Sequence, residues 1–175
     1  MLKRTVLAVA LGVALAAAGV AAAAAVTHQG SASSSATAGR VTLHQTKIGK
    51  VLATSSGRTL YLFMKDKNGR SACYGQCASY WPPLMKKGTL RAGAGVKASL
   101  LGTTKRKNGK RQVTYNHHPL YLYAGDTGAG QVSGQGLNFF GGKWYVLSAA
   151  GRAIKAAPAG GGTTGTTTYT VPGYP

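Results

Sequence analysis

The chain has 175 residues, of which 21 are Lys or Arg and only two are acidic, so its formal net charge is +19. This composition excludes an acid–base enzyme built on a cluster of carboxylates, and it excludes an all-carboxylate cage for Ca²⁺ or Mg²⁺. The 26 Gly residues favour turns over long helices. We therefore expect a basic, turn-rich protein that is not an enzyme, and a hydrolase is the least favoured class.

Residues 1–26 have the pattern of a secretory signal peptide. A short cationic start, Met-Leu-Lys-Arg, precedes an uncharged, Ala-rich stretch that offers several small-x-small cleavage sites before Val26. The alternative is an uncleaved membrane anchor, because the apolar stretch is long enough to cross a bilayer. The first cysteine is Cys73, so a thiol-linked lipid at a new N-terminus is excluded. The sequence predicts a secreted or extracytoplasmic protein, in the cell wall or the periplasm.

The rest of the chain divides into a linker, one domain and a tail. Residues 27–40 are rich in Ser, Ala and Gly and predict a flexible linker. Residues 151–175 are rich in Gly, Thr and Pro and predict a disordered tail. Residues 41–150 remain as a single small domain.

The domain is predicted to be mainly β. Two hairpins are expected, one on each side of a short helical turn that ends at a Pro-Pro pair. The elements, in chain order, are a weakly alternating segment at 41–48, strands at 50–54 and 58–64, a helical turn near 72–81, strands at 111–115 and 120–124, and a strand at 143–147.

An internal repeat links the two hairpins. The segment Leu60–Asp66 (LYLFMKD) matches Leu120–Asp126 (LYLYAGD), and each copy is followed by a Gly-Gln pair and then by a Trp. Self-similarity at a fixed offset indicates two copies of one structural unit. We therefore predict two tandem hairpin-based repeats, the first over about 45–88 and the second over about 109–148. The two Asp residues of the motif are the only acidic residues in the chain.

The motif has a structural interpretation and a binding interpretation. Alternation along each strand places the Leu residues on one face, for a core, and the aromatic residues on the other. As turn acceptors, the two carboxylates would bind loop amides and a cation, with lowered pKa values and a flat dependence of stability on pH down to about pH 3. Alternatively, each aromatic–Asp set binds a ligand; a catalytic Asp is a weaker option, because no partner is evident. The candidate residues are Tyr61, Phe63, Asp66, Tyr121, Tyr123 and Asp126.

The two Tyr-x-aromatic-x-x-Asp motifs, together with the run Cys-Tyr-Gly-Gln-Cys-Ala-x-x-Trp-Pro-Pro-Leu, resemble a known family. It is the bacterial secreted-repeat or predicted-lipoprotein family that this motif defines. The resemblance covers roughly residues 45–148 and implies export and a repeat architecture, without an established activity. This chain lacks the lipid-acceptor cysteine, and its second copy lacks the Cys pair and the Pro-Pro segment.

Cys73 and Cys77 are the only cysteines. Export favours a disulfide between them, and their spacing allows one. The alternatives are a metal site completed by His117 and His118, or a redox role. A c-type haem is excluded because Ala78, and not His, follows the second cysteine. We expect no cofactor and no metal.

A basic run lies around Asn108-Gly109, in what the sequence predicts to be an exposed loop. It is either a solvated loop or a surface that binds a polyanion, such as an anionic cell-wall polymer or a membrane surface. Sequence-specific recognition of nucleic acid is not expected, because no recognition helix is visible; no specific protein partner is predicted. The residues are Lys105, Arg106, Lys107, Lys110 and Arg111.

Two functional hypotheses follow. The first is an exported, non-enzymatic binding or structural module that associates with anionic polymers of the cell envelope. The second is a small-ligand, metal or redox-accessory protein that uses the aromatic–Asp sites or the cysteine pair.

Overall fold

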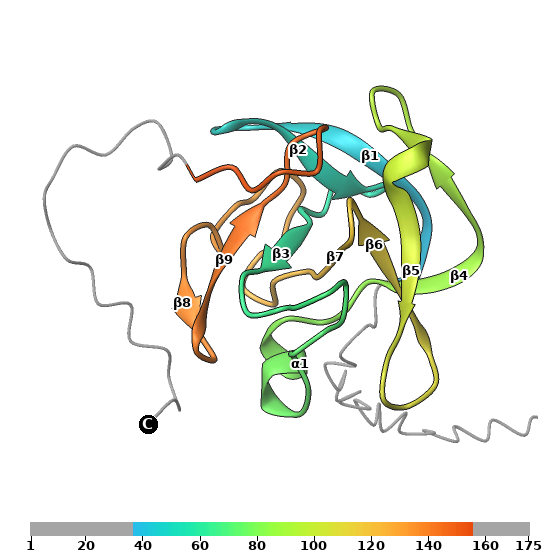
Figure 1. The fold of residues 1–175 in the computed structure, drawn as a ribbon. Coiled ribbons are helices and arrows are strands. Elements are labelled where there is room, and N and C mark those ends of the chain that lie inside the picture. Colours follow the sequence, from blue (N-terminus) through green and yellow to red (C-terminus); the bar gives the residue numbers. More distant parts are fainter. Residues whose placement is uncertain (1–36, 156–175) are drawn as a thin grey trace, which may run out of the picture. The chain divides into compact units, whose positions relative to one another are not determined.

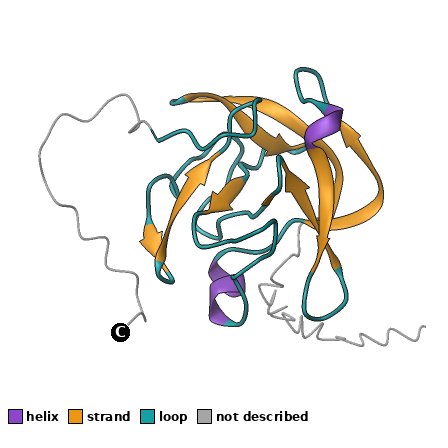
Figure 2. Cartoon of the chain, in the orientation of Figure 1, coloured by secondary structure: helices purple, strands orange, loops and turns teal. Residues whose placement is uncertain are grey.

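The computed structural model describes residues 37–155. The predicted signal peptide, most of the predicted linker and most of the predicted tail lie outside these residues. The described part is mainly β with one short α-helix, as the sequence predicts (Figure 1, Figure 2). Its elements are β1 (Thr37–Thr46), β2 (Gly49–Thr54), β3 (Tyr61–Phe63), α1 (Gln76–Tyr80), β4 (Met85–Ala92), a 3-10 turn (Ala98–Leu100), β5 (Leu101–Lys105), β6 (Arg111–Tyr115), β7 (His118–Pro119), β8 (Asn138–Phe139) and β9 (Gly142–Val146).

The strands form two sheets. The larger has the order β2-β1-β4-β6-β5, with β7 paired to β6, and the smaller has the order β3-β9-β8. The β1–β2 and β5–β6 pairs are regular antiparallel hairpins, with Val41 opposite Thr54 and Leu101 opposite Tyr115. β1 and β4 run parallel, with a register shift near Ala38. The two hairpins are thus brought into one sheet through β4.

The first predicted hairpin, 50–54 with 58–64, is only partly correct. Its tight turn forms, because the N–H of Gly57 bonds to the carbonyl of Thr54 and Ala53 lies opposite Thr59. Beyond that bridge β3 leaves β2 and pairs with β9, a strand near the end of the domain, so that Phe63 lies opposite Trp144. The full-length partner of β2 is β1, whose polar residues give only a weak strand signal.

The second predicted hairpin is correct at its turn and too long in its second strand. Asn116 and His117 join β6 to β7 with φ values of 47° and 64°, the left-handed conformation that a two-residue hairpin turn requires. Pairing with β6 ends at Pro119, and Tyr121 then pairs with Tyr61. The predicted helical turn is present but shorter, as α1.

The folded part extends beyond the predicted domain at both ends. β1 begins at Thr37, inside the predicted linker. On the other side, the N–H of Ile154 bonds to the carbonyl of Val146, inside the predicted tail. Among residues 37–155, no helix is long and apolar enough to cross a membrane.

Strand alternation sorts the motif residues into two cores. The Leu residues of both copies pack with Val113 and Tyr115 in one cluster. The aromatic residues of both copies pack with Trp81 and Trp144 in the other. The predicted separation of Leu and aromatic faces is therefore present, but the aromatic face is as buried as the Leu face.

The two repeats are interleaved, and not placed side by side as independent hairpins. Tyr61 and Tyr121 exchange both backbone hydrogen bonds, at 2.8 and 3.0 Å. The last strand of the second repeat, β9, pairs with β3 of the first. In return, the N–H of Leu84 at the end of the first repeat bonds to the carbonyl of Leu120 in the second. Each copy therefore completes the other.

Candidate functional site

Each aspartate of the motif accepts a hydrogen bond from the tyrosine of the other copy. The hydroxyl of Tyr121 donates to Oδ2 of Asp66 at 2.8 Å, and the hydroxyl of Tyr61 donates to Oδ2 of Asp126 at 2.7 Å. This exchange follows from the backbone pairing of the two tyrosines, which sets their side chains across the boundary between the repeats. The motif is therefore one reciprocal unit and not two separate sites.

The second oxygen of each carboxylate binds the loop that follows its own motif. Oδ1 of Asp66 accepts the N–H of Ala72 at 2.8 Å, and Oδ1 of Asp126 accepts the N–H of Ser133 at 2.9 Å. Neither carboxylate forms an ion pair with any residue between 37 and 155, although the sequence led us to expect a cation at each. Each carboxylate instead accepts a hydrogen bond from a tyrosine hydroxyl.

The aromatic residues of the motif fill the space between the aspartates. Trp81 and Trp144 stack with ring centroids 3.9 Å apart, and Phe63 stacks on Trp144 at 4.0 Å. Tyr123 lies against Trp81 at 4.4 Å. All of these side chains are buried. The aromatic–Asp sets thus hold each other, and they do not line an open groove for a small ligand.

Burial changes the titration of Asp66. Desolvation raises the pKa of this carboxyl from 3.8 to about 6, against the opposing effects of the Ala72 amide, the Tyr121 hydroxyl and the charge of Arg106. The expectation of a lowered pKa is therefore wrong for Asp66. Burial and the facing carboxylates also raise the pKa of Tyr61 and of Tyr121 well above the usual range, so both hydroxyls stay protonated donors.

We expect the protein to become more stable as the pH falls from about 7 to about 4, and not to keep a constant stability. The folded pKa of Asp66 is above its unfolded value, so the folded state binds a proton between about pH 6 and pH 4 that the unfolded state does not. Burial lowers the pKa of His118, which acts in the opposite direction. Thermal melts of the wild type and of Asp66→Asn across this range isolate the contribution of Asp66. Parallel curves for the two proteins would contradict this assignment.

Cys73 and Cys77 form a disulfide, with their Cα atoms 5.2 Å apart. Both residues are buried in the aromatic cluster just before and within α1. Because the two sulfur atoms are bonded to each other, they offer no thiolate to a metal. No group of metal-binding side chains is found among the residues that the structure describes.

Arg106 differs from the rest of the basic run. The sequence places it in an exposed loop, but its side chain is only 5% exposed. Its guanidinium donates to Oε1 of Gln112 at 2.5 Å, to Oγ of Ser71 at 2.9 Å and to the carbonyl of Cys73 at 2.6 Å. The segment is a tight turn joining β5 to β6, so Arg106 points inward. The expectation of an exposed Arg106 is therefore wrong.

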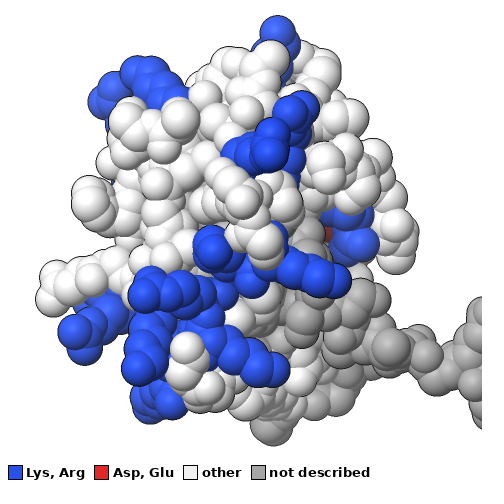
Figure 3. All heavy atoms as spheres, turned by 90° about the vertical axis from the view of Figure 1, so that its right-hand side faces the viewer, with Lys and Arg blue, Asp and Glu red and all other residues white. Residues whose placement is uncertain are grey.

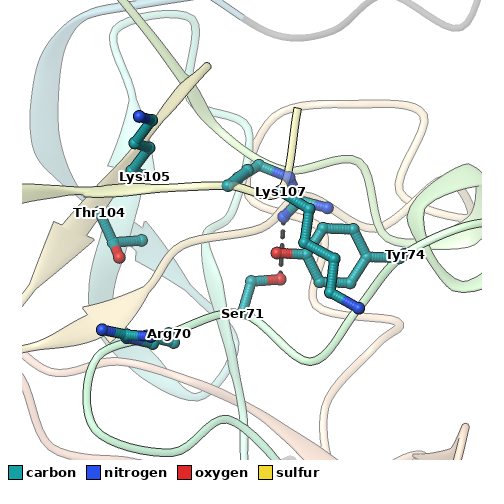
Figure 4. Close-up of a pocket in the computed structure, with 7 residues that line it drawn as sticks. Arg70, Ser71, Tyr74, Thr104, Lys105 and Lys107 are labelled. Atoms are coloured by element: carbon teal, nitrogen blue, oxygen red, sulfur yellow. Dashed lines mark hydrogen bonds between the residues drawn. The ribbon is translucent and has the colours of Figure 1, made fainter. Parts of the chain in front are cut away.

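The other four cations of the run, Lys105, Lys107, Lys110 and Arg111, are exposed. Lys and Arg side chains gather on the face shown in Figure 3, where acidic atoms are barely visible. Lys107 also lies over the ring of Tyr74, 5.0 Å from its centroid. These residues meet the loop before α1, which contributes Arg70 and Ser71 (Figure 4).

Three adjoining hollows lie on this surface, with volumes of about 440, 490 and 450 Å³. The first shares Tyr74 and Arg106 with the second, and Arg70 and Ser71 with the third, so the first lies between the other two. We call this row of three hollows the basic track, because cations and no acidic residues line it. Its cations are Lys65, Lys67, Arg70, Lys86, Lys87, Lys105, Arg106, Lys107 and Lys110.

Five of these cations were not candidates from the sequence. They lie in two short segments, residues 65–70 and the Lys86-Lys87 pair, both distant in sequence from the basic run. Conversely, Arg111 belongs to the basic run but is not among the residues that line the track; its guanidinium donates to the hydroxyl of Thr103 at 3.1 Å. The fold, and not the local sequence, assembles this surface.

Comparison with known proteins gives a family and no detailed relative. No curated protein and no solved structure matches the chain. A model of one protein family matches twice, over residues 42–85 and residues 102–148. The two matches contain the two copies of the motif in turn, which agrees with the repeat described above. The chain therefore belongs to the family described as a secreted repeat of unknown function.

Proposed function

We propose that this secreted repeat protein is a non-enzymatic module of the cell envelope, in the wall or the periplasm, that holds an anionic chain polymer in the basic track. One observation supports this most directly: nine cations and no acidic residue line three adjoining hollows. An anionic polymer that binds along such a surface releases its condensed counterions, which makes binding favourable and strongly dependent on salt.

The buried aspartates fit this proposal. Asp126 is 1% exposed, and Asp66 is partly buried behind the loop that carries Ser71. Asp126 is thus removed from the surface, where a carboxylate would repel an anionic ligand, and neither aspartate lines the basic track. The charged side chains that line the track are therefore all positive.

The shape of the surface favours a polymer over a membrane. A chain can enter successive hollows, whereas a flat bilayer contacts only their rims. Membrane binding also gains from apolar side chains that insert into the lipid. Among the large hydrophobic residues of the described part, only Met64 is exposed, at 45%.

Retention on an immobilised phosphate polymer tests the proposal. We expect the full chain to bind long-chain polyphosphate and to lose roughly a hundredfold or more in affinity between about 50 and 200 mM salt, because several cations engage at once. The triple variant Lys86→Gln, Lys87→Gln, Lys110→Gln should bind more weakly at every salt concentration. The matched control is Lys47→Gln with Arg91→Gln and Lys97→Gln, which removes the same number of exposed cations, none of which lines the track.

Two results would overturn the proposal. One is retention that does not respond to salt. The other is an equal loss of binding in the control and in the track variant, which would mean that total charge matters and the track does not. Stronger retention on vesicles of phosphatidylglycerol and phosphatidylcholine than on the polymer would assign the surface to a membrane instead.

A further inference from the structure

We propose that the middle hollow of the basic track is a subsite for a phosphate group, so that the polymer held there is a phosphodiester or polyphosphate and not a polycarboxylate. This inference rests on the proposed function and specifies its ligand. The hollow is lined by Arg70, Ser71, Tyr74, Thr104, Lys105, Arg106 and Lys107.

The first observation is a buried charge that no carboxylate contacts directly. The three hydrogen-bond acceptors around the Arg106 guanidinium are an amide oxygen, a hydroxyl and a backbone carbonyl, and all are neutral. A buried guanidinium is costly unless an anion lies nearby. Asp66 acts on it only at a distance, through Tyr121 and Ser71, whose hydroxyls are 2.8 Å apart. An anion bound in the hollow would supply the missing charge.

Arg106 is held in place for this role. Its guanidinium lies 4.3 Å from the centroid of the Tyr74 ring, in addition to its hydrogen bonds. A side chain fixed in this way has already lost its conformational freedom and its water, so it adds attraction to the site without further ordering on binding. It therefore provides a fixed charge in the lining of the hollow, while the exposed cations provide direct contacts.

The second observation is the distribution of donors around the hollow. Arg70 and Ser71 come from the loop before α1, whereas Thr104 and Lys107 come from the end of β5 and the turn after it (Figure 4). Guanidinium and ammonium donors and the Thr104 hydroxyl thus line the hollow from two segments, whereas the Ser71 hydroxyl already donates to the carbonyl of Cys73 at 3.3 Å. A tetrahedral phosphate directs its oxygens to several sides, but a planar carboxylate directs both to one side. Arg is also well matched to phosphate oxygens through its paired N–H groups.

Calorimetric titration with two small anions tests the subsite on the intact secreted protein. The probes are tripolyphosphate and citrate, both multivalent anions, one with phosphoryl groups and one with carboxylates. We expect tripolyphosphate to bind about tenfold more tightly than citrate at equal salt. Arg70→Gln and Lys107→Gln should each weaken tripolyphosphate binding about tenfold, the effect of one lost charge-assisted hydrogen bond. Both side chains are exposed, so neither substitution should prevent folding. Lys97→Gln is the control and should leave binding unchanged.

The outcomes separate this inference from the proposed function. If polyphosphate is retained in a salt-dependent way but citrate equals tripolyphosphate, the phosphate subsite is wrong and the polymer track stands. The same holds if Arg70→Gln and Lys107→Gln behave like Lys97→Gln. If tripolyphosphate binds selectively but no polymer is retained, the subsite stands and the proposed function falls.

Discussion

Replacing Asp126 with Ala should lower the free energy of unfolding by about 3 kcal/mol. The carboxylate is almost fully buried and accepts the Tyr61 hydroxyl at 2.7 Å and the Ser133 amide at 2.9 Å. Removing it leaves the buried Tyr61 hydroxyl and the part-buried Ser133 N–H without this acceptor, and an unsatisfied buried donor is expensive. Chemical denaturation of the wild type and the variant measures the difference. Asp66→Ala should cost less, because Asp66 is more exposed and pays a desolvation penalty when it is ionised.

A double-mutant cycle distinguishes the reciprocal pairs from general loss of packing. Tyr61→Phe and Asp126→Ala should be coupled, because they remove the donor and the acceptor of one hydrogen bond. Tyr61→Phe and Asp66→Ala should be close to additive, although both residues belong to the same copy of the motif. If the stronger coupling were found within a copy and not between copies, the reciprocal arrangement would be refuted.

Trp81→Ala should destabilise the protein by about 3–5 kcal/mol, the largest effect that we expect from a single substitution. Trp81 is fully buried and stacks on Trp144 at 3.9 Å, with the ring planes 3° apart. Its edge also closes against Gly134, where an added Cβ would lie 2.7 Å from the indole ring. Truncation to Ala would therefore leave a cavity in the aromatic cluster, and the surrounding side chains could fill it only by shifting.

Tyr80→Ala is the matched control for this experiment. Tyr80 is the preceding aromatic residue of α1, but it is only half-buried, and its nearest ring is that of Phe140, at a centroid distance of 6.0 Å. Its replacement should therefore cost about 1 kcal/mol or less. Similar losses for Trp81→Ala and Tyr80→Ala would show that the stacked pair does not hold the aromatic cluster together.

Local patterns were enough to predict the parts of this fold that depend on neighbouring residues. Alternation in Leu60–Phe63 correctly separates the Leu core from the aromatic core, because side chains in a strand point to opposite faces. The turn at Asn116 and His117 could also be predicted locally, because Asn and His tolerate the left-handed backbone conformation that such a turn requires. The disulfide follows from the export signal and the spacing of Cys73 and Cys77.

The remaining features depend on contacts between distant segments, which no local pattern specifies. β3 has the composition of a hairpin partner for β2, yet it gains more by placing Phe63 against Trp144. Arg106 is indistinguishable in sequence from its exposed neighbours, and only the positions of Ser71 and Gln112 explain why it is buried. The basic track likewise joins residues that are up to 45 positions apart, from Lys65 to Lys110.

The interleaving of the two copies has a consequence for how such a domain arises. Tyr61 and Tyr121 pair with each other, and one oxygen of each aspartate accepts its hydrogen bond from the tyrosine of the opposite copy. A polypeptide with one copy would thus lack the partner copy for the hydrogen bond of its aspartate and for that of its tyrosine. Two such polypeptides could supply these partners to each other as a symmetric dimer. The present chain is equivalent to such a dimer fused head to tail. Within one chain the two halves need not be identical, and only the first contains the Cys73–Cys77 bridge.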